Sequence, residues 1–285
     1  MDKASWSRLP GRGVVAVDGP EARHFLQNLI TNDVDGLDPG NACYAALLSP
    51  QGKILFDFIV FATGDGFLLD VPRGAARDLV ARLTLYRLKA DVQVVDRTQE
   101  LEVQAAWGMK HPPRRFILDP RLPDLGFRKI APSDSKPDEA GTETDANAYA
   151  AHRIALGVPE GDSDYQYGGV FPHDANIDQL KGADFSKGCF VGQEVVSRMQ
   201  HRGTARRRIV QIRGEALSKG SEITDGDTLI GTVGSTSDDI GIAMVRIDRV
   251  AQAIAARRKF ITNGRPVEIQ APPWTSFRLS DPAGS

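Results

Sequence analysis

The first part of the chain alternates short apolar runs with turns and amphipathic stretches. Residues 13–17, Gly-Val-Val-Ala-Val, predict a buried strand, and the turn of residues 18–20 ends in a proline suited to the first position of a helix. Apolar side chains then recur at the i, i+3, i+4 and i+7 positions of a helix face: Ala22, Phe25, Leu26 and Leu29. The pattern predicts a strand followed by an amphipathic helix.

More strands and a second helix follow. Residues 44–48 and 53–62 are apolar and are separated by Ser-Pro-Gln-Gly, which has turn chemistry, so they predict a hairpin. A second turn leads into an apolar stretch at residues 67–71. The next helix is predicted from apolar residues about one turn apart: Ala75, Leu79, Leu83 and Tyr86. This order indicates an α+β fold.

The pattern changes towards the C-terminus. Residues 131–147 hold few apolar side chains and predict an exposed loop, and residues 146–156 predict a helix capped by Gly157. Beyond Arg206, short β-like runs are separated by Gly, Ser and Asp; they span residues 208–213, 228–233, 241–247 and 266–271. This spacing predicts a small antiparallel barrel or sandwich as a second domain.

Composition narrows the class of protein. The 285 residues are 41% hydrophobic and 25% charged, which is typical of a folded protein of about two domains. Two cysteines exclude a disulfide framework and indicate a reducing compartment. The first residues lack the apolar core of a signal peptide, and no run reaches the roughly 18 apolar residues that cross a bilayer. We therefore expect a cytoplasmic protein that is not inserted into a membrane.

The net charge of the chain does not point to a general class of binding partner. The chain has 35 basic and 37 acidic side chains, so we do not expect its overall charge to attract nucleic acid. The arginines Arg198, Arg202 and Arg206, with their neighbours Arg207 and Arg208, form a basic stretch that could hold polyglutamate or a nucleic acid backbone. The alternative is a solvated surface, because no aromatic residues are interleaved to stack bases. Five histidines and two distant cysteines show no metal-ligand spacing, so no metal site is predicted.

One segment carries most of the candidate chemistry. It reads Lys187-Gly188-Cys189-Phe190-Val191-Gly192-Gln193-Glu194. The two glycines leave the sulfur uncrowded, and the Gln-Glu pair predicts the start of a helix. A neighbouring lysine and a helix N-terminus should both lower the pKa of the Cys189 thiol. The alternative is a free cysteine buried as a small apolar residue.

This segment resembles the Lys-Gly-Cys-aromatic-x-Gly-Gln-Glu signature of the YgfZ family, folate-binding relatives of the aminomethyltransferase (T-protein) of the glycine cleavage system. Residues 19–33, 152–159 and 172–180 are also similar to elements of that family. The resemblance implies a T-protein-like folate-binding α+β body over residues 1–203 and a small antiparallel β-barrel over residues 204–285. It further implies tetrahydrofolate or a one-carbon derivative as cofactor, and transient contact with iron–sulfur client proteins.

The resemblance also suggests folate contacts. Asp57 lies in an apolar run that is similar to the T-protein segment whose second aspartate faces the folate, and a carboxylate in apolar surroundings needs a partner. Tyr149 falls at a position where YgfZ relatives can hold a folate-packing tryptophan and T-proteins an arginine. Arg153, four residues further on, belongs to a segment similar to the family's Arg-x-x-x-Gly-x-Pro element, and both residues are candidate folate contacts. Arg12 stands where the family has a second tryptophan. The alternatives are a solvated Asp57, ordinary helix packing for Tyr149 and a surface position for Arg153.

Three hypotheses follow. The first is a tetrahydrofolate-binding protein that assists iron–sulfur protein maturation or repair through Cys189. The second is a folate-dependent one-carbon (aminomethyl) transferase, and the third is a protein- or RNA-binding scaffold that uses the arginine stretch. Because T-proteins lack the cysteine motif, it favours the first over the second. Whether the protein is an enzyme stays open.

Overall fold

The computed structural model describes residues 3–138, 140–203 and 205–280. The chain divides into two compact units. The first unit contains Met1–Pro50, Leu55–Tyr149 and Leu180–Val191, and the second contains Gln51–Ile54, Ala150–Gln179 and Gly192–Ser285. These units are discontinuous, whereas the predicted boundary between residues 203 and 204 separates two continuous segments. Segments upstream of the barrel strands are grouped with them because they share hydrogen bonds, such as that from Arg153 to Ser235.

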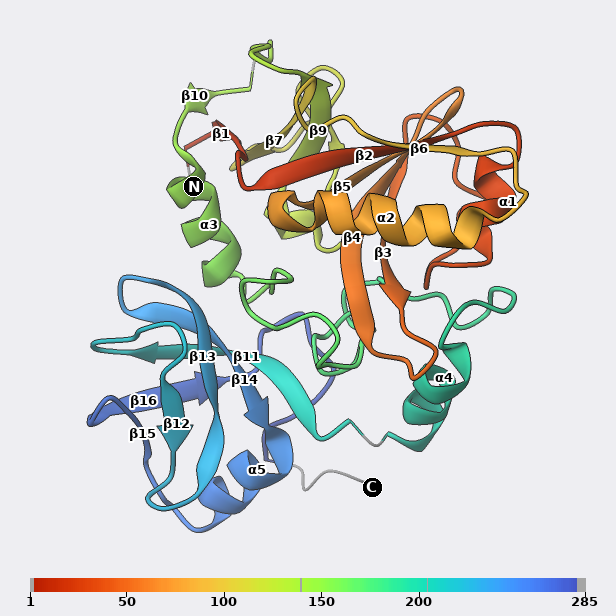
Figure 1. The fold of residues 1–285 in the computed structure, drawn as a ribbon. Helices are drawn as coiled ribbons and strands as arrows, with labels where there is room; N and C mark the ends of the chain where they lie inside the picture. The colour runs from red at the N-terminus through yellow and green to blue at the C-terminus, as the bar shows by residue number, and fades with distance from the viewer. Residues whose placement is uncertain (1–2, 139, 204, 281–285) are drawn as a thin grey trace. The chain divides into compact units, whose positions relative to one another are not determined.

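The first unit contains a five-stranded sheet with the order β3-β4-β5-β2-β6. Its strands are β2 (Arg12–Asp18), β3 (Ala42–Leu48), β4 (Ile54–Ala62), β5 (Gly66–Pro72) and β6 (Gln93–Asp96), and its helices are α1 (Ala22–Gln27) and α2 (Ala76–Arg87), preceded by η1 (Arg73–Ala75). The predicted strands and helices of this region are confirmed. The apolar run in β2 is buried because the strand contacts both α2 and a strand of a second sheet (Figure 1).

That second sheet has the order β10-β1-β7-β9-β8. It comprises β1 (Ser5–Arg8), β7 (Leu101–Trp107), β8 (Ile117–Leu118), β9 (Phe127–Pro132) and β10 (Thr142–Glu143), with η2 (Pro123–Leu125) between β8 and β9. The predicted exposed loop of residues 131–147 is therefore only partly correct. β10 pairs in parallel with β1, and Ala140 is buried, because backbone pairing does not depend on apolar side chains.

The second unit contains a closed six-stranded barrel of order β11-β14-β13-β12-β15-β16, with antiparallel pairs throughout. Its strands are β11 (Arg207–Gly214), β12 (Glu222–Thr224), β13 (Leu229–Ser237), β14 (Ile240–Arg246), β15 (Phe260–Thr262) and β16 (Arg265–Gln270). The predicted α+β class and C-terminal barrel are confirmed. The sequence pattern did not indicate α5 (Ile247–Ala255), whose Ile247 and Val250 join the barrel core.

Two further helices carry predicted site residues. α3 (Ala146–Ala155) begins in the first unit, with Tyr149, and ends in the second, with Arg153. α4 (Gln193–Arg202) begins at the predicted glutamine of the cysteine motif. The motif is therefore a loop that leads directly into a helix.

Candidate functional site

Cys189 lies in an exposed part of the motif loop. A Cβ atom added at Gly188 would have no heavy atom within 4 Å, so the backbone beside the thiol is open, as predicted. Gly192 precedes α4 with a φ of 80°, a left-handed conformation that glycine adopts without strain. Phe190, on the other side of the cysteine, is buried. The thiol is thus exposed in a loop whose next aromatic side chain is anchored.

Lys187 makes contacts that the sequence did not predict. Its Nζ donates hydrogen bonds to the carbonyl oxygens of Ile30 (2.8 Å) and Asn32 (2.7 Å). Burial lowers the pKa of Lys187 to about 8, and Asp33 opposes this shift. The Lys187 ammonium, which was expected to act on the Cys189 thiol, is therefore hydrogen-bonded to two backbone carbonyls.

The second cysteine, Cys43, differs from Cys189. Cys43 is half-buried in β3, and burial raises the pKa of its thiol to about 12, against the opposing charge of Lys187. A neutral thiol is a poor nucleophile and a poor metal ligand. Of the two cysteines, only Cys189 is exposed for chemistry at neutral pH.

Asp57 is buried and hydrogen-bonded to a tyrosine. The Tyr44 hydroxyl donates to Asp57 Oδ2 at 2.9 Å. The Tyr44 carbonyl in turn accepts from Asn32 Nδ2 at 2.7 Å, and Asn32 is one of the two residues held by Lys187. Asp57 is therefore connected to the cysteine motif through Tyr44 and Asn32. Neither partner could be identified from sequence spacing.

Tyr149 is enclosed by charged and aromatic side chains. Its hydroxyl accepts from Arg128 Nη2 at 3.2 Å and from Arg121 Nη2 at 3.4 Å. The ring of Trp107 lies edge-on, with 5.5 Å between the centroids. Arg121 also lies over the ring of Tyr44, 5.9 Å from its centroid. Tyr149 and Asp57 thus belong to one network, joined through Arg121 and Tyr44.

A buried ladder of alternating charges supports this network. Arg12 Nε donates to Asp70 at 2.5 Å, Arg128 donates to both Asp70 and Asp119, and Arg121 donates two hydrogen bonds to Asp119. All five side chains are buried. Arg12 replaces the expected aromatic residue with an ion pair. The ladder holds three guanidinium groups against two carboxylates, and its Arg121 is the member that lies over the ring of Tyr44.

Arg153 lies in the second unit with partners of its own. Its Nη1 donates to Asp164 Oδ2 (2.8 Å) and to the Val158 carbonyl (2.6 Å), and its Nη2 donates to the Ser235 hydroxyl (3.2 Å). Arg153 is buried, in contrast to the surface alternative. These contacts involve neither Asp57 nor Tyr149, and the predicted role of Arg153 in folate binding stays a prediction.

Several arginines of the basic stretch form ion pairs. Arg198 pairs with Glu194 of the motif at 2.6 Å on exposed α4. The neighbouring Arg207 and Arg208 pair with Asp174 (2.8 Å) and Asp178 (2.6 Å). Arg202 and Arg206 are exposed. Several of the positive charges therefore face carboxylates, which weakens the field that a polyanion would meet.

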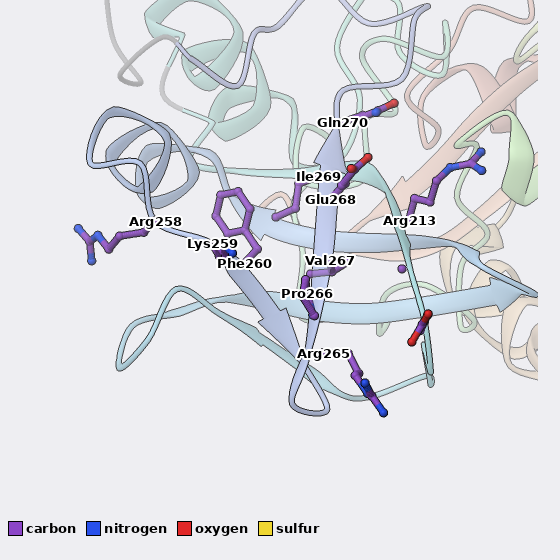
Figure 2. Close-up of a pocket in the computed structure, with 12 residues that line it drawn as sticks. Arg213, Arg258, Lys259, Phe260, Arg265, Pro266, Val267, Glu268, Ile269 and Gln270 are labelled. Atoms are coloured by element: carbon purple, nitrogen blue, oxygen red, sulfur yellow. The ribbon is translucent and has the colours of Figure 1, made fainter.

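Two cavities bear on ligand binding. A cavity of about 730 Å³ on the barrel is lined by Arg213, Lys259, Phe260, Arg265 and residues around them. Figure 2 shows that its arginines extend in different directions and do not converge on one point. A second cavity, of about 540 Å³, lies in the first unit beside β3 and β8. Its wall includes Tyr44, Asp119 and Cys43, together with the apolar residues Leu37, Ile117 and Leu118.

The described residues contain neither a metal-binding group nor a helix that could span a membrane. Among residues 3–138, 140–203 and 205–280, no group of three or more His, Cys, Asp or Glu side chains could hold a metal ion. No helix in the same part of the chain is long and apolar enough to cross a membrane.

Comparisons with known proteins bear on this arrangement. Residues 11–112 match the family model described as GCVT N-terminal domain, and residues 206–277 match that of the CAF17 C-terminal beta-barrel domain. The human iron-sulfur cluster assembly factor IBA57 is 31% identical over 284 residues, covering 87% of this chain and 79% of that protein. The chain belongs to the YgfZ/IBA57 family. The predicted family is therefore confirmed.

Other relatives extend the comparison. The IBA57 homologue of Mycosarcoma maydis is 35% identical over 226 residues, which are 72% of this chain and 56% of the relative. The chain thus spans little more than half the length of that fungal relative. The crystal structure of aminomethyltransferase T from Bartonella henselae covers 96% of this chain and 87% of its own, with a TM-score of 0.73 and 18% identity. This likeness shows the T-protein-like fold.

The comparisons correct the predicted location. The human and fungal relatives are named as mitochondrial proteins, so the cytoplasmic location expected from the sequence is wrong. The physical reason is that a low cysteine count distinguishes a reducing from an oxidising compartment. It does not distinguish one reducing compartment from another.

Proposed function

We propose that this protein assists the assembly of iron–sulfur proteins, with Cys189 as its reactive thiol and reduced folate as its ligand. The observation that carries the proposal is the exposed Cys189 in a loop anchored at Lys187 and Phe190. Its relatives in the YgfZ/IBA57 family are named as iron–sulfur cluster assembly factors.

One thiolate supplies one ligand, whereas the irons of a cluster usually take four ligands from protein. Any cluster that Cys189 contacts is therefore shared with a client protein, and the cluster is cargo rather than a resident cofactor.

The first unit offers residues suited to folate. A folate ring needs an apolar surface, a hydrogen-bonding carboxylate for its edge and a positive charge for its anionic tail. The cavity bounded by Tyr44 supplies apolar side chains, Asp57 supplies a carboxylate one hydrogen bond away, and Arg121 supplies positive charge. Tyr149 is already covered by Trp107 and Arg128, so we infer that it holds the arginines in place. When bound, tetrahydrofolate would supply one-carbon chemistry.

Complementation tests the role of the thiol. Cells that lack their own family member receive the wild-type protein, Cys189→Ser or the matched control Cys43→Ser, and the activities of iron–sulfur enzymes are measured. We expect Cys189→Ser to abolish support. Cys43→Ser should retain support, and because Cys43 lines the cavity proposed for folate, the binding of tetrahydrofolate by this variant is measured alongside. Full support by Cys189→Ser at equal protein level would refute the proposal.

Calorimetry with tetrahydrofolate tests the ligand separately. We expect a dissociation constant on the order of micromolar, because the family's second aromatic residue is replaced by Arg12. No detectable binding at millimolar ligand would exclude folate while leaving the thiol hypothesis intact.

A further inference from the structure

A group of hydrogen bonds fastens the segment before Cys189 to the turn that follows α1. Lys187 Nζ contributes the two bonds to Ile30 and Asn32 described above. Three more join the same two segments: Asp184 N–H to Thr31 O (2.9 Å), the Thr31 hydroxyl to Gly182 O (2.6 Å) and Asn32 Nδ2 to Lys181 O (2.7 Å). We call residues 30–32 and 181–187 the loop dock. Both parts lie in the first unit.

The receiving half of the loop dock is itself anchored to a sheet. Ile30 and Thr31 are fully buried. Thr31 exchanges bonds with Ala46 of β3: its backbone N–H donates to Ala46 O at 2.9 Å, and its hydroxyl accepts from Ala46 N–H at 2.8 Å. The Asn32 side chain also donates to Tyr44 O in β3. The segment that precedes the cysteine is therefore hydrogen-bonded to residues that are themselves buried or hydrogen-bonded to β3.

Lys187 is the contact of the loop dock that lies nearest to the thiol in the chain. Its Nζ lies 5.5 Å from the centroid of the Phe190 ring, and Phe190 is buried. Gly188 and Cys189 are thus bracketed by two held side chains while Cys189 itself is exposed. Gly188 is open and lacks a side chain, so it would restrain the cysteine little if the lysine contacts were lost.

Building on the proposed function of Cys189, we propose that Lys187 is a positioning residue that seats the cysteine loop, so that the thiol meets a client-bound cluster in one orientation. Its hydrogen bonds are charge-assisted, so each is stronger than a hydrogen bond between neutral groups. Without the lysine contacts, the loop holds the orientation that meets the cluster for only a fraction of the time, and its apparent activity falls to that fraction. We expect removal of the ammonium to reduce support of iron–sulfur enzymes by about tenfold or more.

The test compares Lys187→Met, Lys187→Arg and the control Lys89→Met in the full chain. Lys89 lies in the same unit, but its side chain is exposed and lines neither of the two cavities described above. The readouts are complementation at matched protein level, hydrogen exchange of the amides in residues 181–191, thermal stability and the rate of Cys189 alkylation. Hydrogen exchange separates loss of positioning from loss of folding, because only the former is confined to the loop.

We expect Lys187→Met to exchange faster only within residues 181–191, to keep an alkylatable Cys189 and to lose support. Lys187→Arg should recover part of it, because a guanidinium can also donate to two carbonyls. Lys89→Met should behave as wild type. If Lys187→Met unfolds the protein, Lys187→Arg decides between the outcomes. If Lys187→Arg shows wild-type hydrogen exchange and still supports iron–sulfur enzymes, the positioning role is upheld. If it shows wild-type hydrogen exchange but no longer supports these enzymes, the role is overturned.

Two outcomes separate this inference from the function on which it rests. If Cys189→Ser abolishes support and a folded Lys187→Met retains it in full, the positioning role is refuted and the role of the thiol stands. If Cys189→Ser retains full support, the proposed function fails, and the positioning role fails with it.

Discussion

Replacement of Asp119 by asparagine tests whether the buried charge ladder holds the first unit together. Asp119 accepts from Arg121 Nε (3.0 Å), Arg121 Nη2 (2.7 Å) and Arg128 Nε (3.1 Å), and its Oδ1 also accepts from the Arg121 backbone N–H (3.1 Å). The substitution keeps the shape of the side chain but removes its charge. Two buried guanidinium groups then lose a shared carboxylate.

The expected loss of stability follows from these contacts. Breaking a buried ion pair by removing one partner costs about 3–5 kcal/mol, and asparagine retains one oxygen acceptor, so we expect the lower end, about 3 kcal/mol. For a chain of this size, that corresponds to a fall in melting temperature of about 6–12 °C. Losses near zero would mean that the arginines find other partners.

The pH dependence has a defined sign. Burial would raise the pKa of the Asp119 carboxyl, but Arg121 and Arg128 outweigh burial and hold the pKa below its ordinary value of 3.8. A lowered pKa means that the carboxylate stabilises the fold above pH 3.8 and that this contribution is lost as the pH falls through the folded-state pKa. The difference between wild type and Asp119→Asn should therefore be full at pH 7 and shrink below pH 3.8.

Urea unfolding followed by near-ultraviolet circular dichroism, at pH 7 and at pH 3, measures both effects. Asp239→Asn is the matched control, because Asp239 pairs with Arg213 at 3.2 Å on an exposed surface, where a pair contributes about 1 kcal/mol or less. Equal effects of the two substitutions at pH 7 would refute the role of the ladder. A difference that grows as the pH falls would refute the assigned sign.

Other predictions follow from single contacts. Iodoacetamide at pH 8 should alkylate Cys189 and leave Cys43 unmodified in the folded protein, since burial raises the pKa of Cys43 to about 12; peptide mass spectrometry would reveal equal labelling if this is wrong. Asp57→Asn should weaken folate binding several-fold without lowering the melting temperature steeply, and calorimetry beside a thermal melt would show the reverse if Asp57 is only structural. Arg153→Met should lower the stability of the second unit by about 3 kcal/mol or more, as Asp164 loses its buried partner, and an unchanged urea midpoint would contradict this.

The cysteine motif shows how far local sequence reaches. An exposed Cys189, an open Gly188 and a helix starting at Gln193 all depend on residues within a few positions of one another, and all three were predicted. The role of Lys187 was not, because its acceptors at Ile30 and Asn32 lie more than 150 residues away in the chain. Nothing in the lysine's own neighbourhood specifies that distance.

The candidate folate residues show the same division. Asp57 was identified because a carboxylate within an apolar strand needs a partner, but the partner, Tyr44, depends on how two strands are paired. Arg153 has buried partners rather than a surface position, because Asp164 and Ser235 come from separate segments of the second unit.

By itself, the sequence determined the periodic elements, the α+β class, the C-terminal β domain and the family signature, because each depends on short-range spacing of apolar, glycine and turn residues. Tertiary structure alone decided the strand order of the barrel, the parallel pairing of β10 with β1, the charge ladder and the loop dock. These features join groups that are distant in the chain, and hydrogen bonds and ion pairs form only when folding brings such groups within about 3 Å of each other. The spacing of residues along the chain therefore does not predict these contacts.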